Sequence, residues 1–184
     1  MDAQKELDRI AHTISRCRQC RHGKSGLPVP GEGDAHAELM FIGEAPGRRE
    51  AETGRPFVGR SVMLLTRYLL AIGIDRKDVY ISSPVKYFPG PRAPTPTEIA
   101  HGRKHLQKQI KVINPQLIVL LGNTAMKSLL RGLYQVTKFH GQVVEEVGKR
   151  YFLTFHPAAA LRFPKTIAPL LKNDFKKLKT LVSQ

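Results

Sequence analysis

Two acidic side chains flank a bare turn early in the chain, within the segment GEAPGRRE. Gly43 and Gly47 carry no side chains and Pro46 fixes a bend, so the backbone of this turn can approach a flat ligand closely. Glu44 and Glu50 then lie on or beside the turn, where carboxylates can do acid–base or electrostatic chemistry. The alternative is a tight strand-to-helix connection with a solvated carboxylate.

A second candidate for chemistry is the pair Cys17 and Cys20, the only cysteines of the chain. A single C-x-x-C is too sparse for the disulfide framework of a secreted protein. It is consistent with a metal site, a redox pair or a relic, and the spacing alone keeps these uses open.

The charge of the chain predicts a polyanionic partner. The chain has 30 lysines and arginines against 15 aspartates and glutamates, a formal net charge of +15 and a pI of about 10.2. Nucleic acid is the first candidate for such a partner, and a merely basic soluble protein is the alternative.

The length predicts one domain. At 184 residues, 41% of them hydrophobic, the chain can bury one good core, and we expect residues 1–184 to form a single unit. No apolar run reaches the roughly 18 residues that span a bilayer, and the N-terminal MDAQKELDRI lacks the apolar centre of a signal peptide. The sequence therefore predicts a cytoplasmic protein without a membrane partner.

Short apolar runs alternate with amphipathic stretches along the chain. Strands are expected at 38–43, 78–87 and 116–122, with a pair of short strands at 141–147 and 150–156. Helices are expected at 59–73, at 97–112 with Thr97 and Glu98 opening it, at 123–132 and at 169–182, whereas the proline-rich segment 88–96 cannot be regular. This alternation predicts an α/β fold whose mostly parallel sheet has helices on both faces.

Four loops follow the expected strands, and sites in such folds gather at the carboxyl ends of the strands. The loops are GEAPG (43–47), SSPVKY (82–87), LGNTA (121–125) and FHPAAALR (155–162). GEAPG matches neither G-x-G-x-x-G nor G-x-x-x-x-G-K-[ST], so the sequence predicts no nucleotide cofactor of the Rossmann or Walker kind.

Taken in order, GEAPG, GRPFVGR, VYISSPVKY, NPQLIVLLGNTA and FHPAAALR resemble the uracil-DNA glycosylase superfamily, closest to its fourth family, the thermostable iron–sulfur type. The resemblance covers nearly the whole chain. It implies a three-layer sandwich with a central, mostly parallel four-stranded sheet flanked by helices. It also implies a monomeric, monofunctional DNA repair glycosylase that flips out a deaminated base, hydrolyses its N-glycosidic bond and leaves an abasic site.

The resemblance assigns roles by position. It places Glu44 and Glu50 in the catalytic loop, and it implies that Phe57 stacks on the extracted base. The positions expected to bind the base or substrate are Gly43, Ala45, Pro46, Gly47, Phe57, Ser83 and Asn123. By default Phe57 would instead be a core residue or a lid over the loop.

The chemistry of base excision fits these residue types. Departure of the base leaves an oxocarbenium-like sugar and an anionic base, so Glu44 on the sugar side can stabilise the cation and orient water. His156 is the implied donor to the oxyanion that develops on the base. The alternative for His156 is a cap of the helix that follows it.

The same resemblance implies a DNA-binding segment. Residues 158–162 are expected to enter the minor groove and fill the space left by the flipped base. The positions expected to contact DNA are Lys86, Arg92, Pro157, Ala158, Ala159 and Arg162, with further phosphate contacts from Arg60, Arg67 and Lys165. For any one lysine, a solvated surface charge is the alternative.

The chain departs from the fourth family at its cluster. There, four cysteines hold a 4Fe-4S cluster; here Cys17 and Cys20 match the first pair, whereas Tyr87 takes the third place and Gly102 or its neighbour Arg103 the fourth. Two thiolates cannot supply a four-thiolate cluster, so we expect neither a complete cluster nor another cofactor.

Three interpretations of the cysteine pair stay open. The pair is a relic without metal, or half of a zinc site with two of His22, His101 and His105, or a reversible disulfide or incomplete cluster. His101 and His105 are spaced i, i+4 on one face of an expected helix, which suits a shared site.

A second departure concerns base recognition. Ser83 stands where many relatives carry an asparagine that reads the uracil edge, and a hydroxyl has one donor where an amide both donates and accepts. Uracil is the first expected base, with hypoxanthine, xanthine or a damaged pyrimidine as alternatives. A weakly active relative that binds DNA damage is the other alternative, although the presence of both Glu44 and His156 favours activity.

Overall fold

The structure is a computed structural model of the chain, and it describes residues 2–56 and 58–182. Its strands are β1 (Glu32–Gly33), β2 (Leu39–Ile42), β3 (Tyr80–Ser82), β4 (Leu117–Leu121), β5 (Gln142–Glu146) and β6 (Lys149–Thr154). Its helices are α1 (Ala3–Arg16), α2 (Arg18–Arg21), α3 (Arg48–Thr53), α4 (Arg60–Ala71), α5 (Pro96–Ile113), α6 (Gly122–Leu130), α7 (Val136–Phe139), α8 (Pro157–Arg162), α9 (Ile167–Val182) and the short 3-10 helix η1 (Arg76–Asp78).

The strands form one sheet, which in the described part of the chain is six-stranded with the order β1-β3-β2-β4-β6-β5. The inner strands β3, β2, β4 and β6 run parallel, and Ile42 pairs with Ser82 on one side and Leu120 on the other. The α/β fold with a mostly parallel central sheet is confirmed. The expectation of four strands was too low, because β1 and β5 add antiparallel edges to the parallel core.

The central strands are covered on both faces. Every residue of β2 and of β4 is buried, as expected for parallel strands that read as continuous apolar runs. β3 is shorter than the expected strand at 78–87 and ends at Ser82. Pro84 has no N–H to offer a ladder, so the chain leaves the sheet before it.

The helix that follows β3 starts one residue before the expected position. The Thr95 hydroxyl accepts a hydrogen bond from the Glu98 N–H, and the Glu98 carboxylate accepts one from the Thr95 N–H. This capping box, with Pro96 in the first turn, fixes the start of α5.

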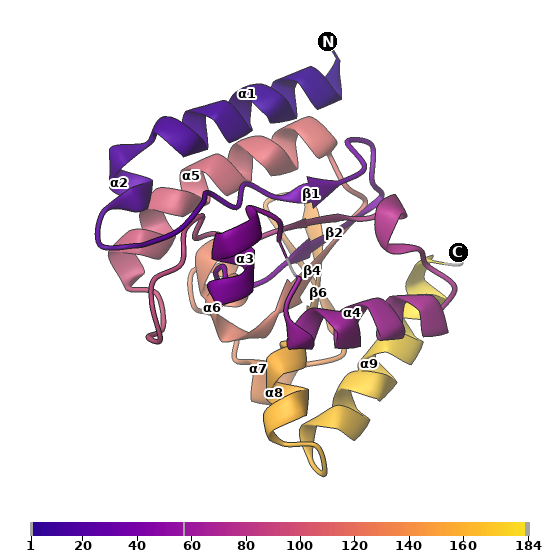
Figure 1. Cartoon of the computed structure of the whole chain (residues 1–184). Helices are drawn as coiled ribbons and strands as arrows, with labels where there is room; N and C mark the ends of the chain where they lie inside the picture. Colours follow the sequence, from indigo (N-terminus) through magenta and orange to yellow (C-terminus); the bar gives the residue numbers. More distant parts are fainter. Residues whose placement is uncertain (1, 57, 183–184) are drawn as a thin grey trace.

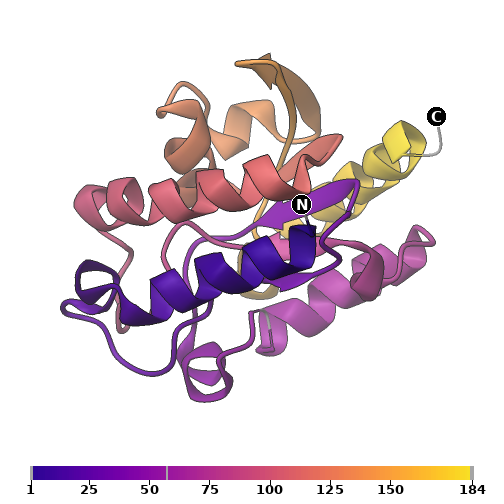
Figure 2. The same ribbon diagram turned by 90° about the horizontal axis from the view of Figure 1, so that it is seen from above.

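The N-terminal helix α1 was not among the expected elements. Asp2 caps it, and its buried residues Leu7, Ile10 and Ile14 recur at helical spacing along one face. Figure 2 shows α1 running alongside α5, against which it packs. The apolar face of α1 thereby extends the core beyond the sheet.

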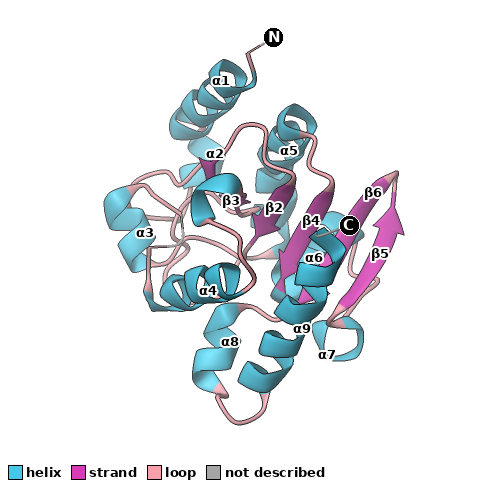
Figure 3. Cartoon of the chain, turned by 90° about the vertical axis from the view of Figure 1, so that its right-hand side faces the viewer, coloured by secondary structure: helices cyan, strands magenta, loops and turns pink. Residues whose placement is uncertain are grey.

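Helices form a layer on each side of the sheet (Figures 1 and 3). α5 and α6 lie on one face, and α4 and α9 lie on the other, with α8 packed against both of the latter. Phe175 of α9 shows how that second layer is held: its ring stacks on Phe41 of β2, with centroids 6.4 Å apart, and on Tyr68 of α4, at 5.0 Å. None of the described helices has the length and apolar character needed to cross a membrane.

The parallel core determines where the polar loops lie. Because β2, β3, β4 and β6 point the same way, the loops that follow them emerge along one edge of the sheet. The motifs around residues 43–47, 83–87, 122–124 and 155–158 therefore lie at that edge.

Candidate active site

A cavity of about 320 Å³ opens at this edge. It is lined by the predicted residues Glu44, Ala45, Pro46, Gly47, Glu50, Ser83, His156 and Ala158, together with Val29, Pro56 and Ser61. Gly43 is not among the described residues that line it, and its N–H donates to the Ser82 carbonyl at 2.9 Å. The structure thus brings into one cavity residues that the sequence scatters over more than a hundred positions.

Glu44 is exposed and directed across the strand ends. Its Oε2 accepts a hydrogen bond of 2.6 Å from the hydroxyl of Thr124, in the first turn of α6. The loop after β2 is therefore connected to the start of α6, directly after β4, through the carboxylate itself. Thr124 was not predicted from the sequence, where its only signal was a hydroxyl within the LGNTA segment.

Glu50 is buried, with 8% of its surface exposed, and its carboxylate is used by the backbone. Oε2 accepts from the N–H of Gly47 at 3.1 Å, and Oε1 accepts from the N–H groups of Val58 and Gly59 at 3.0 and 2.9 Å. Gly47 and Gly59 are the N-caps of α3 and α4. Glu50 therefore accepts from the N–H groups of both N-cap glycines, and it fastens the turn at residues 43–47 to residues 58–59.

His156 lies at the junction of β6 and α8, where it is partly buried. It is the N-cap of α8, and its Nδ1 accepts from the Ala158 N–H at 3.1 Å. The neutral ring then carries its proton on Nε2, so it is a donor there. Burial lowers the pKa of His156, against the opposing pull of Glu44 and Glu50, which favours this neutral form.

The close approach of His156 to the junction of β4 and α6 depends on Gly122. Gly122 has a φ of +84°, and a Cβ at that position would lie 3.3 Å from the Cβ of His156. A side chain there would meet both a strained backbone and a crowded neighbour. Gly122 therefore lets the start of α6, which carries Thr124, come close to His156.

Ser83 lines the cavity while most of its surface is buried. Its hydroxyl donates to the Val85 carbonyl at 2.7 Å. Since a hydroxyl has a single proton, Ser83 offers a ligand an acceptor and no donor in this conformation.

Asn123, one of the residues predicted to bind the base, stands elsewhere. Asn123 is not among the described residues that line the cavity, and its Oδ1 accepts from the Val136 N–H at 2.8 Å, at the start of α7. Its neighbour Thr124 makes the contact with Glu44 instead. Phe57 lies outside the described residues, so its stacking role stays a prediction.

Lys86 is a correction to the predicted DNA contacts. Its side chain is 1% exposed, and its Nζ donates to the Pro30 carbonyl, the Ser82 hydroxyl and Gln109 Oε1 at 2.7 to 2.9 Å. Burial lowers the pKa of Lys86 to about 7. A phosphate cannot reach this ammonium, because the loop that leaves the sheet at Pro84 turns Lys86 inward beneath residue 30.

Arg92 is at the surface but already has a partner. Both guanidinium ends pair with the Glu98 carboxylate at 2.8 Å, and Lys24 pairs with the same group at 3.1 Å. This ion-pair group holds the N-terminus of α5. Any phosphate contact by Arg92 would compete with Glu98.

α8 presents the other predicted DNA-contacting residues beside the cavity. Pro157 is buried at the start of the helix, while Ala158 is exposed and lines the cavity. Ala159 is half-buried and Arg162 is exposed, with its guanidinium 5.4 Å from the ring centre of Phe163. Leu161 and Phe163 are 45% and 50% exposed, an apolar pair that sequence analysis did not single out.

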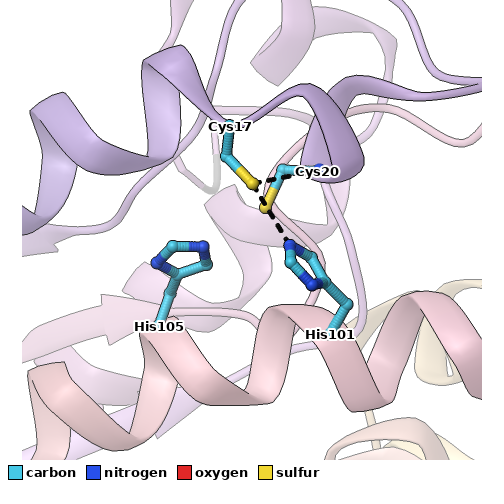
Figure 4. Close-up of side chains that lie close together, drawn as sticks. All are labelled: Cys17, Cys20, His101 and His105. Carbon is cyan, nitrogen blue, oxygen red and sulfur yellow. Dashed lines mark hydrogen bonds between the residues drawn. The ribbon is translucent and has the colours of Figure 1, made fainter.

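The cysteine pair belongs to a second group of polar side chains. One ligand atom from each of Cys17, Cys20, His101 and His105 lies within 4.8 Å of all the others, so this group could hold a metal ion. Figure 4 shows both imidazole rings projecting from one face of α5 toward the two sulfur atoms. His22 does not belong to this group among the described residues, and it caps the carboxyl end of α2.

Comparisons with known proteins point to one family. The family model for the uracil DNA glycosylase superfamily matches residues 30–180. A type-4 uracil-DNA glycosylase of Thermotoga maritima is 38% identical over 97% of this chain and 95% of its own length. A type-4 enzyme of Saccharolobus solfataricus is 39% identical over 96% of this chain and 87% of its own, and a type-5 uracil-DNA glycosylase of Pyrobaculum aerophilum is 32% identical over 72% and 66%.

Proposed function

The chain belongs to the uracil DNA glycosylase superfamily and, as a DNA N-glycosylase, is a hydrolase of base excision repair; we propose that it excises deaminated bases, uracil first among them. The observation that carries this proposal is the shared cavity, which is lined by the Glu44 carboxylate and the His156 imidazole. The carboxylate suits the sugar side of the N-glycosidic bond that breaks, and the imidazole suits the base side.

Glu44 acts on the sugar side. As the base leaves, positive charge develops at C1′ and O4′ of the sugar, and a fixed carboxylate stabilises it. The same carboxylate orients the water whose oxygen forms the new bond to C1′, while the proton of that water balances the charge of the departing base. The Thr124 hydroxyl, 2.6 Å from Glu44 Oε2, holds the carboxylate in place for this role.

His156 acts on the base side. Electrons of the broken C1′–N bond pass into the base, and the negative charge is shared between the ring nitrogen and an exocyclic carbonyl oxygen of the base. A neutral imidazole that accepts from Ala158 at Nδ1 can donate from Nε2 to that oxygen. The lowered pKa of His156 keeps this neutral donor at physiological pH.

Ser83 supports a preference for deaminated bases as a class. Deamination of cytosine to uracil, or of adenine to hypoxanthine, converts a ring nitrogen from an acceptor into an N–H donor. Ser83 has used its proton on Val85, so its oxygen can accept from such an N–H but cannot donate to the parent base. Hypoxanthine and xanthine therefore stand beside uracil as candidate substrates.

α8 supports the proposed mode of DNA binding. The exposed Leu161 and Phe163 can enter the space that a flipped base leaves, as apolar wedges do in other DNA-bending proteins. Arg162 lies between them, where it can contact a phosphate. We further propose that the enzyme acts as a monomer in the cytoplasm, with one chain of 20.6 kDa per DNA lesion.

The test is single-turnover excision on oligonucleotides that carry one uracil, hypoxanthine or xanthine, single-stranded and in duplexes, with cytosine, adenine and thymine as controls. We expect abasic sites at the deaminated bases and none at cytosine or adenine. Glu44→Gln is the matched inactive control on every substrate. Tight binding of these oligonucleotides with no abasic product at any base would reject the enzyme and leave a damage-binding protein.

A further inference from the structure

The group formed by Cys17, Cys20, His101 and His105 joins two distant parts of the chain. Cys17 precedes α2 and Cys20 lies within it, whereas the two histidines lie on α5. The Cys17 sulfur is 3.2 Å from Nε2 of His101, across 84 positions of sequence. Cys20 and His105 are buried, at 4% and 7% exposure.

We propose that these four residues bind one Zn²⁺ ion in a closed tetrahedral site. Zinc takes thiolate sulfur at about 2.3 Å and imidazole nitrogen at about 2.0 to 2.1 Å, so the ligand atoms of a tetrahedral site lie about 3.3 to 3.8 Å apart. Here all four ligand atoms lie within 4.8 Å of one another without an ion. A contraction of at most about 1.5 Å between any two ligand atoms would complete the site.

The ligand set favours one ion over a four-iron cluster. A cluster of that kind takes four thiolates, one for each iron, and the described chain has only these two cysteines. Tyr87 and Gly102, or its neighbour Arg103, stand at the remaining cysteine positions of the fourth family, and none of them offers a thiolate. A Cβ on Gly102 would come within 1.7 Å of the Pro84 carbonyl oxygen, and Tyr87 fills its place with a buried ring whose hydroxyl donates to the Ser15 carbonyl.

Charge also favours zinc. Two thiolates and two neutral imidazoles around Zn²⁺ give a net charge of zero, which suits a partly buried site. Mixed sulfur and nitrogen ligation in a closed tetrahedron is typical of structural zinc. Magnesium and calcium, which take oxygen ligands, are excluded by the same donors.

Apart from the contact between Nε2 of His101 and the Cys17 sulfur, no hydrogen bond orients either imidazole within the described residues. Nδ1 of His101 and Nδ1 of His105 are buried without a hydrogen-bond partner among the described residues. No other polar group of the described protein therefore determines how these rings are turned. A metal ion bound by both rings and both sulfurs would fix the orientation of the rings.

A bound ion could enter this group from a neighbouring cavity, and it would join two helices. A cavity of about 500 Å³ opens beside His101 and is lined in part by His22 and Glu98. The ion would cross-link α2 to α5, and α2 leads into the segment that places Val29 against the active-site cavity. Zinc at this position would stabilise the fold rather than take part in excision.

The test measures metal in the purified, full-length protein, without DNA. After growth with zinc and dialysis against a weak chelator, elemental analysis is expected to give about one zinc and almost no iron per chain. Replacement by Co²⁺ is expected to give the strong visible absorption of a tetrahedral site with sulfur ligands. Cys17→Ser and His101→Gln, both at half-buried positions, are expected to lower the zinc content at least tenfold.

His22→Ala is the matched control, because His22 lines the neighbouring cavity but lies outside the group. It is expected to keep its zinc, and circular dichroism checks that each variant is folded. The proposal is overturned by less than about a tenth of a zinc per folded chain, by two or more irons per chain with a visible cluster band, or by unchanged zinc in Cys17→Ser. None of these outcomes depends on excision, so the proposed function is tested separately.

Discussion

The Glu44 carboxylate and the Thr124 hydroxyl form a 2.6 Å hydrogen bond that joins the loop after β2 to the first turn of α6. This contact gives Glu44 a fixed direction although the side chain is exposed. The pair therefore separates two functions within the cavity: Glu44 supplies negative charge, and Thr124 holds it in place.

Glu44→Gln is expected to lower the single-turnover rate of excision by about two to four orders of magnitude, because the amide keeps the shape of the side chain and loses its charge. DNA affinity should stay level or rise, since a negative charge near the phosphates is gone. Thr124→Val should cost less, about tenfold, because it loosens the carboxylate without removing it. Wild-type excision by Glu44→Gln would show that Glu44 is only a loop residue.

Glu50→Gln is expected to act on the fold before it acts on the chemistry. The carboxylate accepts from three backbone N–H groups, and an amide turns one donor toward them. The loss of an acceptor for a buried N–H should lower the free energy of unfolding by about 1 to 3 kcal/mol. Thermal unfolding measures this, and a fully stable variant with excision as low as that of Glu44→Gln would instead give Glu50 a direct catalytic role.

Most of the fold was predictable from the sequence because it follows from local patterns. The apolar runs that became β2 and β4 stand out from their neighbours, and the helix expected to open at Thr97 and Glu98 begins one residue earlier as α5. The edge strand β1 was not predictable, since it spans only Glu32–Gly33 and has no periodicity of its own. α1 carried a readable signal in Leu7, Ile10 and Ile14, which the sequence analysis did not use.

The site was predictable in its members and less so in its contacts. The motif order brought Glu44, Ser83 and His156 to one edge, but no sequence rule says which way a loop side chain turns. Lys86 is the clearest case, because a lysine in a polar loop is usually solvated and this one is buried under Pro30. The approach of Cys17 to His101 is likewise a long-range contact that only folding reveals.

Arg162 and Lys86 give a matched test of the DNA-contacting surface. Arg162→Ala should weaken DNA binding and reduce the slope of log affinity against log salt by about one phosphate contact. Lys86→Met should leave that slope unchanged, because its ammonium is buried. It should instead lower stability by about 1 to 3 kcal/mol, since Ser82 and Gln109 lose a donor. Equal salt slopes for Arg162→Ala and the wild type would move the phosphate contacts away from α8.

The last prediction concerns the acid side of the pH profile. Burial lowers the pKa of His156 below its ordinary 6.5, so the ring stays neutral at pH values where an exposed imidazole is half protonated. Excision measured in single turnover should therefore hold its rate at pH 6.5 and fall only at lower pH. There protonation of Nδ1 removes the acceptor for the Ala158 N–H and releases the cap of α8.

The stability of the folded protein should also fall as the pH drops. The folded chain prefers the neutral ring, so protonation favours the unfolded chain, and stability falls as pH drops from about 6.5 toward the lowered pKa. His156→Asn keeps an N-cap acceptor but cannot titrate in this range. It should excise about 10² to 10³ times more slowly, as a lost oxyanion donor does, and its rate should lose the acid limb that His156 causes. If His156→Asn excises slowly but its rate still falls at low pH as in the wild type, the acid limb belongs to another titrating group. The protonation of His156 would then not control the rate of excision.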